Sequence, residues 1–251
     1  MTPISPSHYR QDSKPLQTAR RLGRVVCFAV AFSLSVTAAL AVDPPAASKI
    51  PKGHIIAEGS QSPNERYAVT ALDNSEMTDD VDANKLVELK TGRVVAELTG
   101  EPGMVRMNHG GIMPARWSAD SSVLLWEVDG KWFHATMALV RLDKGKLLWQ
   151  CDVLKLLQQE ILMRTRKLNP KKYAKVKKDH EGWGSAYPDG FCVEVEALDP
   201  IAFPLRVRAR LASETKFESI LDTHLEGEIN AKGELKITKF AAGPGPIQCK
   251  F

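Results

Sequence analysis

Four side chains with soft metal-binding atoms gather in one glycine-rich segment, namely Met104, Met107, His109 and Met113. Thioether sulfur and imidazole nitrogen are ligands that select cuprous copper, and the neighbouring glycines would let the segment bend. Copper handling is therefore one hypothesis. Methionine is also an ordinary gap-filling residue of hydrophobic cores, and nothing in the spacing places these four side chains on one side of the chain.

Basic side chains are concentrated between positions 164 and 178, where no acidic residue interrupts them. Such a run can dock on anionic lipid headgroups or on anionic polymers of a cell envelope. The alternative is a solvated helix face, because cations are favoured near helix C-termini. The candidate surface-binding residues are Arg164, Arg166, Lys167, Lys171, Lys172 and Lys175.

Two adjacent aromatic residues, Trp132 and Phe133, follow the turn-like run Asp129-Gly130-Lys131. Aromatic side chains that project from the end of a hairpin can form a platform for carbohydrate or peptide. Aromatic residues in strands more often belong to the core, which is the alternative interpretation.

The remaining reactive residues form no recognisable catalytic or calcium-binding motif. The acidic residues Asp73, Glu76, Asp79, Asp80 and Asp82 lack the regular spacing of a calcium loop, so a solvated connection is the favoured interpretation over a calcium site. No cofactor is expected beyond these copper and calcium possibilities. A hydrolase with a site assembled from scattered residues such as Asp189, His109 and Glu194 is an alternative.

The N-terminus has the order of a secretory signal peptide. Residues 1–24 are basic, residues 25–41 are uncharged and apolar, and Ala39-Leu40-Ala41 ends the run with small residues at alternate positions. We therefore expect cleavage before Val42, residues 42–53 as a linker, and a periplasmic or secreted protein with no transmembrane span after cleavage.

Removing this segment changes the charge of the protein. Residues 1–41 hold five basic side chains and one acidic side chain, so they account for the whole formal charge of +4. The rest of the chain is neutral, and a neutral protein lacks the electrostatic footprint that nucleic-acid binding needs. Oxidising export compartments favour disulfides, and three pairings are open among Cys151, Cys192 and Cys249.

A repeat organises the next hundred residues. The run Ser62-Pro63-Asn64-Glu65 precedes an apolar strand, and so does Ser118-Ala119-Asp120-Ser121. The run Leu86-Val87-Glu88-Leu89 is matched in the same way by Leu139-Val140-Arg141-Leu142, and each is followed by a glycine turn and a further apolar run. Each unit is expected to form about four short antiparallel strands, with the second segment a hairpin.

On these residues, positions 55–150 resemble two consecutive blades of a WD-type or Tol-type β-propeller. The turns at Ser62 and at Trp117-Ser118 stand where that family often has Ser-Pro-Asp-Gly. The resemblance implies blade-like meanders, which commonly build interaction surfaces, although two units are too few to close a ring. The chain as a whole also resembles exported bacterial proteins, a resemblance that implies no activity.

Helical and then strand patterns follow the repeat. Apolar residues at helical spacing predict a helix from Asp152 to Leu168, and Asn169-Pro170 predicts the start of a second helix that ends near Asp179. Alternation then returns at Phe191, in Leu205–Leu211 with three arginines on one face, and in a hairpin across Asn230–Gly233.

The expected fold class is thus mainly β (α+β), a single domain over 54–251 with a helical insertion at 152–181. The favoured hypothesis is a non-catalytic binding or scaffolding module of the cell envelope, whose partner is an envelope protein or an anionic polymer or lipid surface.

Overall fold

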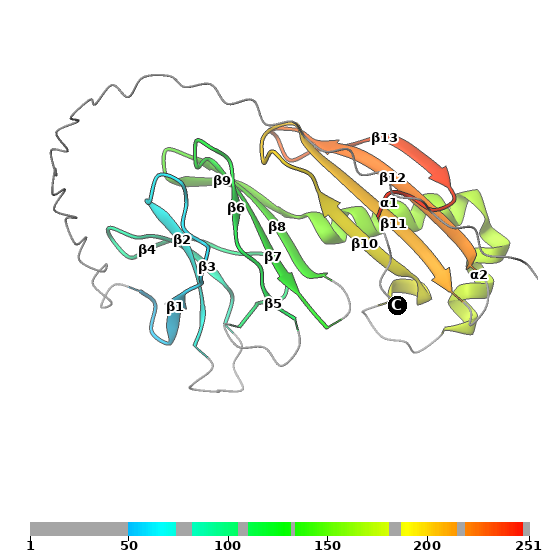
Figure 1. Cartoon of the computed structure of the whole chain (residues 1–251), viewed down its shortest axis with the longest axis horizontal. Helices are drawn as coiled ribbons and strands as arrows, with labels where there is room; N and C mark the ends of the chain where they lie inside the picture. Colours follow the sequence, from blue (N-terminus) through cyan, green and yellow to red (C-terminus); the bar gives the residue numbers. More distant parts are fainter. Residues whose placement is uncertain are drawn as a thin grey trace, which may run out of the picture. The chain divides into compact units, whose positions relative to one another are not determined.

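Thirteen strands in three antiparallel sheets, together with two α-helices, form the part of the chain that the structure describes (Figure 1). This computed structural model describes residues 50–73, 82–104, 110–131, 134–180, 187–214 and 219–247. The mainly β fold with a helical hairpin that the sequence predicts is confirmed. No helix among these residues is long and apolar enough to span a bilayer.

The first two sheets correspond to the two repeat units. Sheet A has the order β1-β2-β3-β4, with the strands β1 (His54–Ile56), β2 (Tyr67–Leu72), β3 (Lys85–Glu88) and β4 (Arg93–Glu97). Sheet B has the order β5-β7-β8-β9, and β6 also pairs with β7. Its strands are β5 (Gly111–Ile112), β6 (Arg116–Trp117), β7 (Val123–Asp129), β8 (His134–Asp143) and β9 (Lys146–Asp152).

The two turns that mark the repeat have the same hydrogen bonds. The hydroxyl of Ser62 donates to Oδ1 of Asn64 at 2.8 Å and accepts from the amide of Tyr67 at 2.9 Å. The hydroxyl of Ser118 donates to Oδ1 of Asp120 at 2.6 Å and accepts from the amide of Val123 at 2.9 Å. The sequence repeat is therefore a structural repeat as well. Whether the two units belong to a propeller family remains a prediction.

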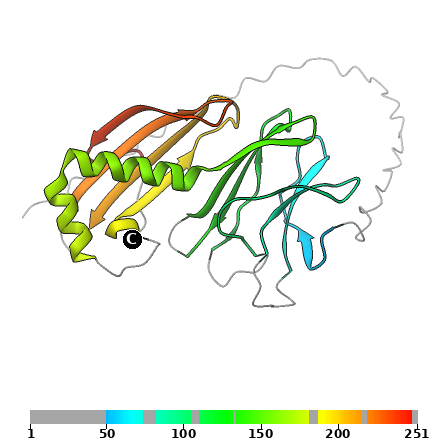
Figure 2. The same cartoon turned by 180° about the vertical axis from the view of Figure 1, so that it is seen from behind.

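The helical hairpin and sheet C follow sheet B along the chain. Helix α1 (Val153–Leu168) continues directly from β9, and α2 (Pro170–Asp179) follows after one residue. After the short turn η3 (Pro188–Gly190), sheet C has the order β10-β11-β12-β13, and Figure 2 shows α1 running along one face of it. Its strands are β10 (Cys192–Ala197), β11 (Leu205–Glu214), β12 (Ser219–Ile229) and β13 (Leu235–Ala242).

Sheet B carries apolar side chains on both of its faces. Leu124 and Trp126 join a core with sheet A, whereas Leu125, Met137 and Leu139 join a second core with α1 and sheet C. Successive strand residues point to opposite faces, so consecutive leucines in β7 serve different cores. This explains why β7 is an almost unbroken apolar run instead of an alternating one.

The structure excludes one of the three possible disulfide pairings. No disulfide joins Cys151 on β9 to Cys192 on β10. Cys249 lies outside the described residues, so the two pairings that include it stay open.

Because β7 is buried on both faces, shortening an apolar side chain on either face should lower the free energy of unfolding. Leu124→Ala and Leu125→Ala should each lower the free energy of unfolding by about 2–5 kcal/mol, because both side chains are fully buried. Leu148→Ala is the matched control, since that side chain is 57% exposed and its truncation should cost less than about 0.5 kcal/mol. Urea unfolding measures all three. A loss in Leu124→Ala no larger than that in the control would show that sheet A does not cover this face of sheet B.

Candidate surface-binding site

The first helix is held to sheet C by its apolar face. Asp152 caps its N-terminus, because the carboxylate accepts a hydrogen bond from the amide of Lys155 at 3.0 Å. Its buried residues recur at helical spacing, and they are Val153, Leu154, Leu157, Ile161 and Thr165. In the last buried turn the hydroxyls of Thr165 and Thr223 are hydrogen-bonded at 2.7 Å, which fixes α1 to β12.

One residue joins the two helices. The amide of Asn169 donates to the carbonyl of Thr165, which closes α1, and its side chain accepts from the amide of Lys172 at 3.3 Å, which caps α2. Pro170 then occupies the first turn of α2, where its missing N–H costs nothing. The hairpin connection is therefore specified by Asn169-Pro170, as the sequence predicts.

The second helix is anchored by Tyr173 and by the turn η3. The Tyr173 ring lies 4.8 Å from the ring of Phe191, and its hydroxyl donates to Oδ2 of Asp189 at 2.6 Å. The ammonium group of Lys177 forms an ion pair with Oδ1 of the same carboxylate at 2.6 Å. Gly190 packs so closely against the end of α2 that an added Cβ would lie 2.5 Å from the Cβ of His180.

The carboxylate of Asp189 is ionised in this anchor. Partial burial acts to raise its pKa, but the hydrogen bonds from Lys177 and Tyr173 outweigh that effect and hold the pKa below its usual value. Burial and the neighbouring Asp189 raise the pKa of the Tyr173 hydroxyl, which therefore remains a donor at neutral pH. Asp189 thus holds α2 to the turn η3. This is a structural role, and it differs from the catalytic role considered in the hydrolase hypothesis.

The outer face of α2 is a stripe of lysines. Lys171, Lys175 and Lys178 recur at positions i, i+4 and i+7, opposite the buried Tyr173 and Val176, and all three are exposed. Arg166, Lys167 and Lys172 are exposed as well. Among the described residues, none of these six basic groups forms an ion pair. We call them the basic cap: Arg166, Lys167, Lys171, Lys172, Lys175 and Lys178.

Arg164 differs from the other predicted surface-binding residues. It is half-buried, and its Nε lies 2.6 Å from Oε1 of Glu160, one helical turn away. The other five predicted residues are all exposed, two in the last turn of α1 and three on α2. The structure places Arg164 in an internal ion pair of α1.

Two lysines of the basic cap oppose the dipole of their own helix. Lys171 and Lys172 lie in the first turn of α2, which contains no acidic residue. The N-terminal end of a helix carries partial positive charge, so each cation there costs about 0.3–1 kcal/mol. The preference of cations for helix C-termini explains Lys177 and Lys178, but it does not explain these two residues.

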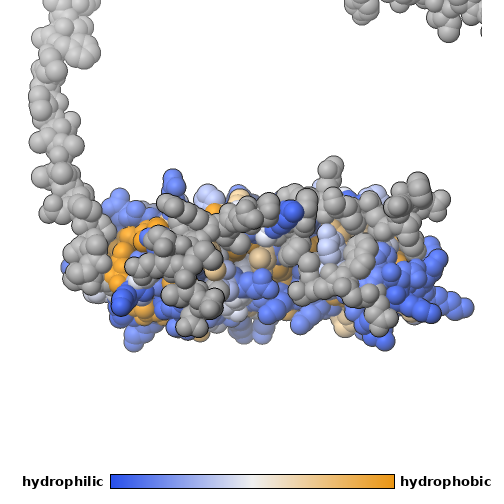
Figure 3. Space-filling view, turned by 90° about the horizontal axis from the view of Figure 1, so that it is seen from below, coloured by the Kyte–Doolittle hydropathy of each residue, from blue (hydrophilic) through white to orange (hydrophobic). Residues whose placement is uncertain are grey.

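Exposed apolar side chains lie beside the basic cap. Met163 is 42% exposed and Leu168 is 52% exposed, both in the second half of α1. Figure 3 shows hydrophilic residues dominating the end of the described domain that carries α2. The sequence does not single out these two residues as exposed, although Met163 directly precedes Arg164 and lies off the apolar stripe of the helix.

The other candidate residues lie partly outside the described chain. Trp132, Phe133, Met107 and His109 are all outside it, so the aromatic platform and the copper loop stay predictions. Met104 and Met113 are described, and Met113 is 40% exposed. Within the described ranges, no group of three or more His, Cys, Asp or Glu side chains could hold a metal ion.

Of the other residues in the scattered hydrolase hypothesis, the structure describes Glu194 but not His109, so that hypothesis stays a prediction. Glu194 is buried on β10, where it lies opposite Arg210 of β11, on the face of sheet C away from the core residues Val193 and Val195. Burial raises the pKa of the Cys151 thiol to about 11, so it stays protonated near neutral pH and is a poor nucleophile.

The chain matches no protein-family model, and no curated protein is significantly similar to it. The functional assignment therefore rests on the geometry of this chain.

The anchor of α2 predicts a pH-dependent contribution to stability. Asp189→Asn should lower the free energy of unfolding at neutral pH by up to about 1 kcal/mol, a small effect because the Asp189 side chain is 33% exposed. The folded pKa is depressed, so this contribution is present above the unfolded pKa of about 4 and is lost as the pH falls through the folded value.

Urea unfolding of both proteins across the acid range measures this difference. The two stabilities should converge in acid. Asp179→Asn is the matched control, since Asp179 is an exposed acidic residue of α2 and forms no ion pair in the described part of the chain. A constant difference between wild type and Asp189→Asn down to the lowest pH would contradict the ion-pair tie.

Proposed function

We propose that the chain is an exported, non-catalytic binding module of the cell envelope, which docks on an anionic lipid surface through the basic cap. The export part of the proposal rests on the signal-like residues 1–41. The observation that carries the docking part is the placement of Lys171 and Lys172 in the helix turn where their charge is least favourable; both are exposed, and neither forms an ion pair with another described residue.

An electrostatic partner would offset the cost of that placement. A basic side chain near an anionic membrane contributes about 1 kcal/mol, which exceeds or matches the penalty at the helix N-terminus. The stripe of Lys171, Lys175 and Lys178 lets one flat surface reach all three side chains together. The attraction is local, because the chain beyond residue 41 has no net charge.

Met163 and Leu168 favour a lipid surface over an anionic polymer. A hydrated polymer offers no apolar phase, whereas the headgroup boundary of a bilayer accepts apolar side chains beside basic ones. Both residues are about half exposed and neighbour the basic cap along the chain. The combination of basic and apolar groups is what interfacial helices use to lie on a membrane.

The anchoring of the hairpin supports this function. Thr165 ties α1 to β12, and Tyr173 with Lys177 ties α2 to Asp189. The cations are therefore displayed on rigid helices, so binding does not have to order a flexible segment first. Sheets A and B would then be held near the membrane with their loops available to other envelope components.

The test is co-sedimentation of residues 42–251 with vesicles that contain anionic lipid, at low salt. Replacing Lys171, Lys172 and Lys175 by Gln should weaken binding about a hundredfold, because each lysine near an anionic surface contributes about 1 kcal/mol to the binding free energy. Binding should also weaken as salt is added, because the interaction is screened.

The matched control removes the same charge elsewhere, with Lys52, Lys146 and Lys232, all exposed, replaced by Gln. This control should bind as the wild type does. Equal losses in the two variants, or equal binding to uncharged vesicles, would overturn the proposal. Binding to anionic polysaccharide without binding to vesicles would overturn the choice of lipid.

A further inference from the structure

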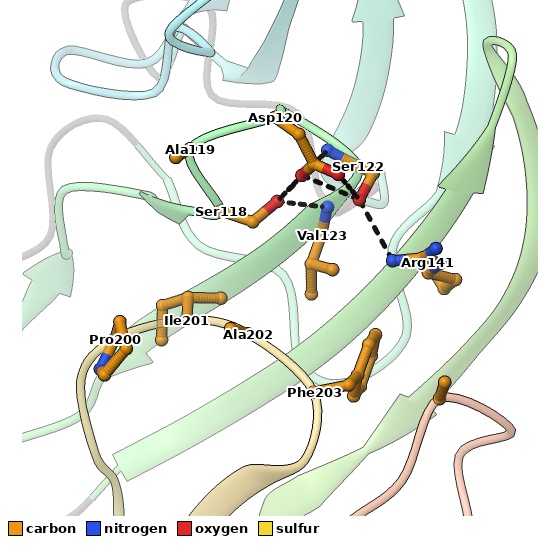
Figure 4. A pocket seen from close by; sticks show the side chains of 11 residues that line it. Ser118, Ala119, Asp120, Ser122, Val123, Arg141, Pro200, Ile201, Ala202 and Phe203 are labelled. Carbon is orange, nitrogen blue, oxygen red and sulfur yellow. Dashed lines mark hydrogen bonds between the residues drawn. The ribbon is translucent and has the colours of Figure 1, made fainter.

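A hollow of about 440 Å³ lies between sheet B and sheet C, away from the basic cap. One wall is the turn between β6 and β7, with Val123 and Arg141 beside it. The facing wall is the loop between β10 and β11, and Figure 4 shows Ile201 and Phe203 on this loop opposite the side chains of the turn. The volume is in the range of sites for small molecules.

The apolar wall is held in place before any ligand binds. The guanidinium of Arg141 lies 5.4 Å from the centre of the Phe203 ring, and the ring of Trp149 lies 5.6 Å from it. Trp149 also donates from Nε1 to the carbonyl of Ala231 at 3.0 Å, and Ile201 is buried. The loop residues thus present a fixed apolar surface to the hollow.

The polar wall holds a guanidinium and a carboxylate that are both hydrogen-bonded to the hydroxyl of Ser122. Arg141 donates from Nη1 to Oγ of Ser122 at 3.0 Å, and that hydroxyl donates to the carboxylate of Asp120 at 2.8 Å. Hydrogen bonds from Ser118 and then Ser122 hold the pKa of Asp120 below its usual value, so it is ionised at neutral pH. Within the described residues, Arg141 makes one hydrogen bond and no ion pair.

The first repeat unit shows that the fold does not need these charges. Asn64 stands in the place of Asp120 and accepts the same serine hydroxyl, although it is neutral. Glu88 stands in the place of Arg141 and forms a closed ion pair with Arg66 at 2.8 Å. In the second unit Ser122 replaces that arginine, which leaves Asp120 and Arg141 as separate charges at the edge of the hollow.

We propose that this hollow binds a small zwitterion, an α-amino acid with an apolar side chain. The carboxylate of the ligand lies at Arg141, its ammonium group lies at Asp120, and its side chain packs against Ile201, Phe203 and Val123. The guanidinium of Arg141 and the carboxylate of Asp120 are bridged by the single hydroxyl of Ser122. This short separation suits an α-amino acid, in which one carbon atom separates the ammonium group from the carboxylate. This site shares no residue with the basic cap and is independent of membrane docking.

L-Leucine is the probe, and isothermal titration calorimetry of the chain lacking residues 1–41 is the measurement. 4-Methylpentanoate lacks the ammonium group, 3-methylbutylamine lacks the carboxylate, and glycine lacks the side chain. Each should bind at least about tenfold more weakly than leucine, because a charge-assisted hydrogen bond or a buried apolar side chain is lost.

Two variants locate the site. Asp120→Asn should fold, because Asn64 makes the equivalent turn, and it should lose the preference for leucine over 4-methylpentanoate. Arg141→Gln should bind leucine at least about tenfold more weakly, with thermal unfolding as the check on its fold. The absence of leucine binding at millimolar concentration, equal affinity for leucine and 4-methylpentanoate, or unchanged leucine binding by Asp120→Asn would overturn the proposal.

Discussion

The burial of sheet B on both faces is the constraint on which the rest of the structure depends. Leu124 and Trp126 of β7 face sheet A, whereas Leu125 faces α1 and sheet C. A sheet exposed on one side would leave several large apolar residues in water, at about 25 cal/mol for each Å². The repeat unit before it and the helix and sheet after it are therefore needed to cover one central sheet.

This arrangement determines where binding surfaces can form. Helix α1 packs its apolar stripe against sheet B and sheet C, and α2 packs against α1 and β12, so the outer sides of the two helices, where the basic cap lies, face solvent. Apolar residues of sheet B, α1 and sheet C share one core, and the hollow beside Arg141 is lined by residues of sheet B and its β6–β7 turn on one side and by the β10–β11 loop on the other. Both candidate surfaces are consequences of how the central sheet is covered.

The sequence predicts the elements well and the contacts between them poorly. Asn169-Pro170 specifies the helix junction locally, and the serine turns recur because each forms its own hydrogen bonds within a few residues. The hollow joins the turn at Ser118 to a loop near Phe203, and no local pattern connects residues so far apart. The hydrogen bond between Tyr173 and Asp189 likewise joins α2 to a turn beyond it, and the sequence alone does not indicate this structural role of Asp189.

Docking through the basic cap would bring the hairpin side of the domain into contact with lipid. A polarity-sensitive fluorophore attached at Met163→Cys, in a chain whose native cysteines are serine, tests it directly. We expect a blue shift on addition of anionic vesicles, and none for the same label at Leu148→Cys, an exposed apolar position on β9. A shift at position 148 alone, or equal shifts at both positions, would contradict it.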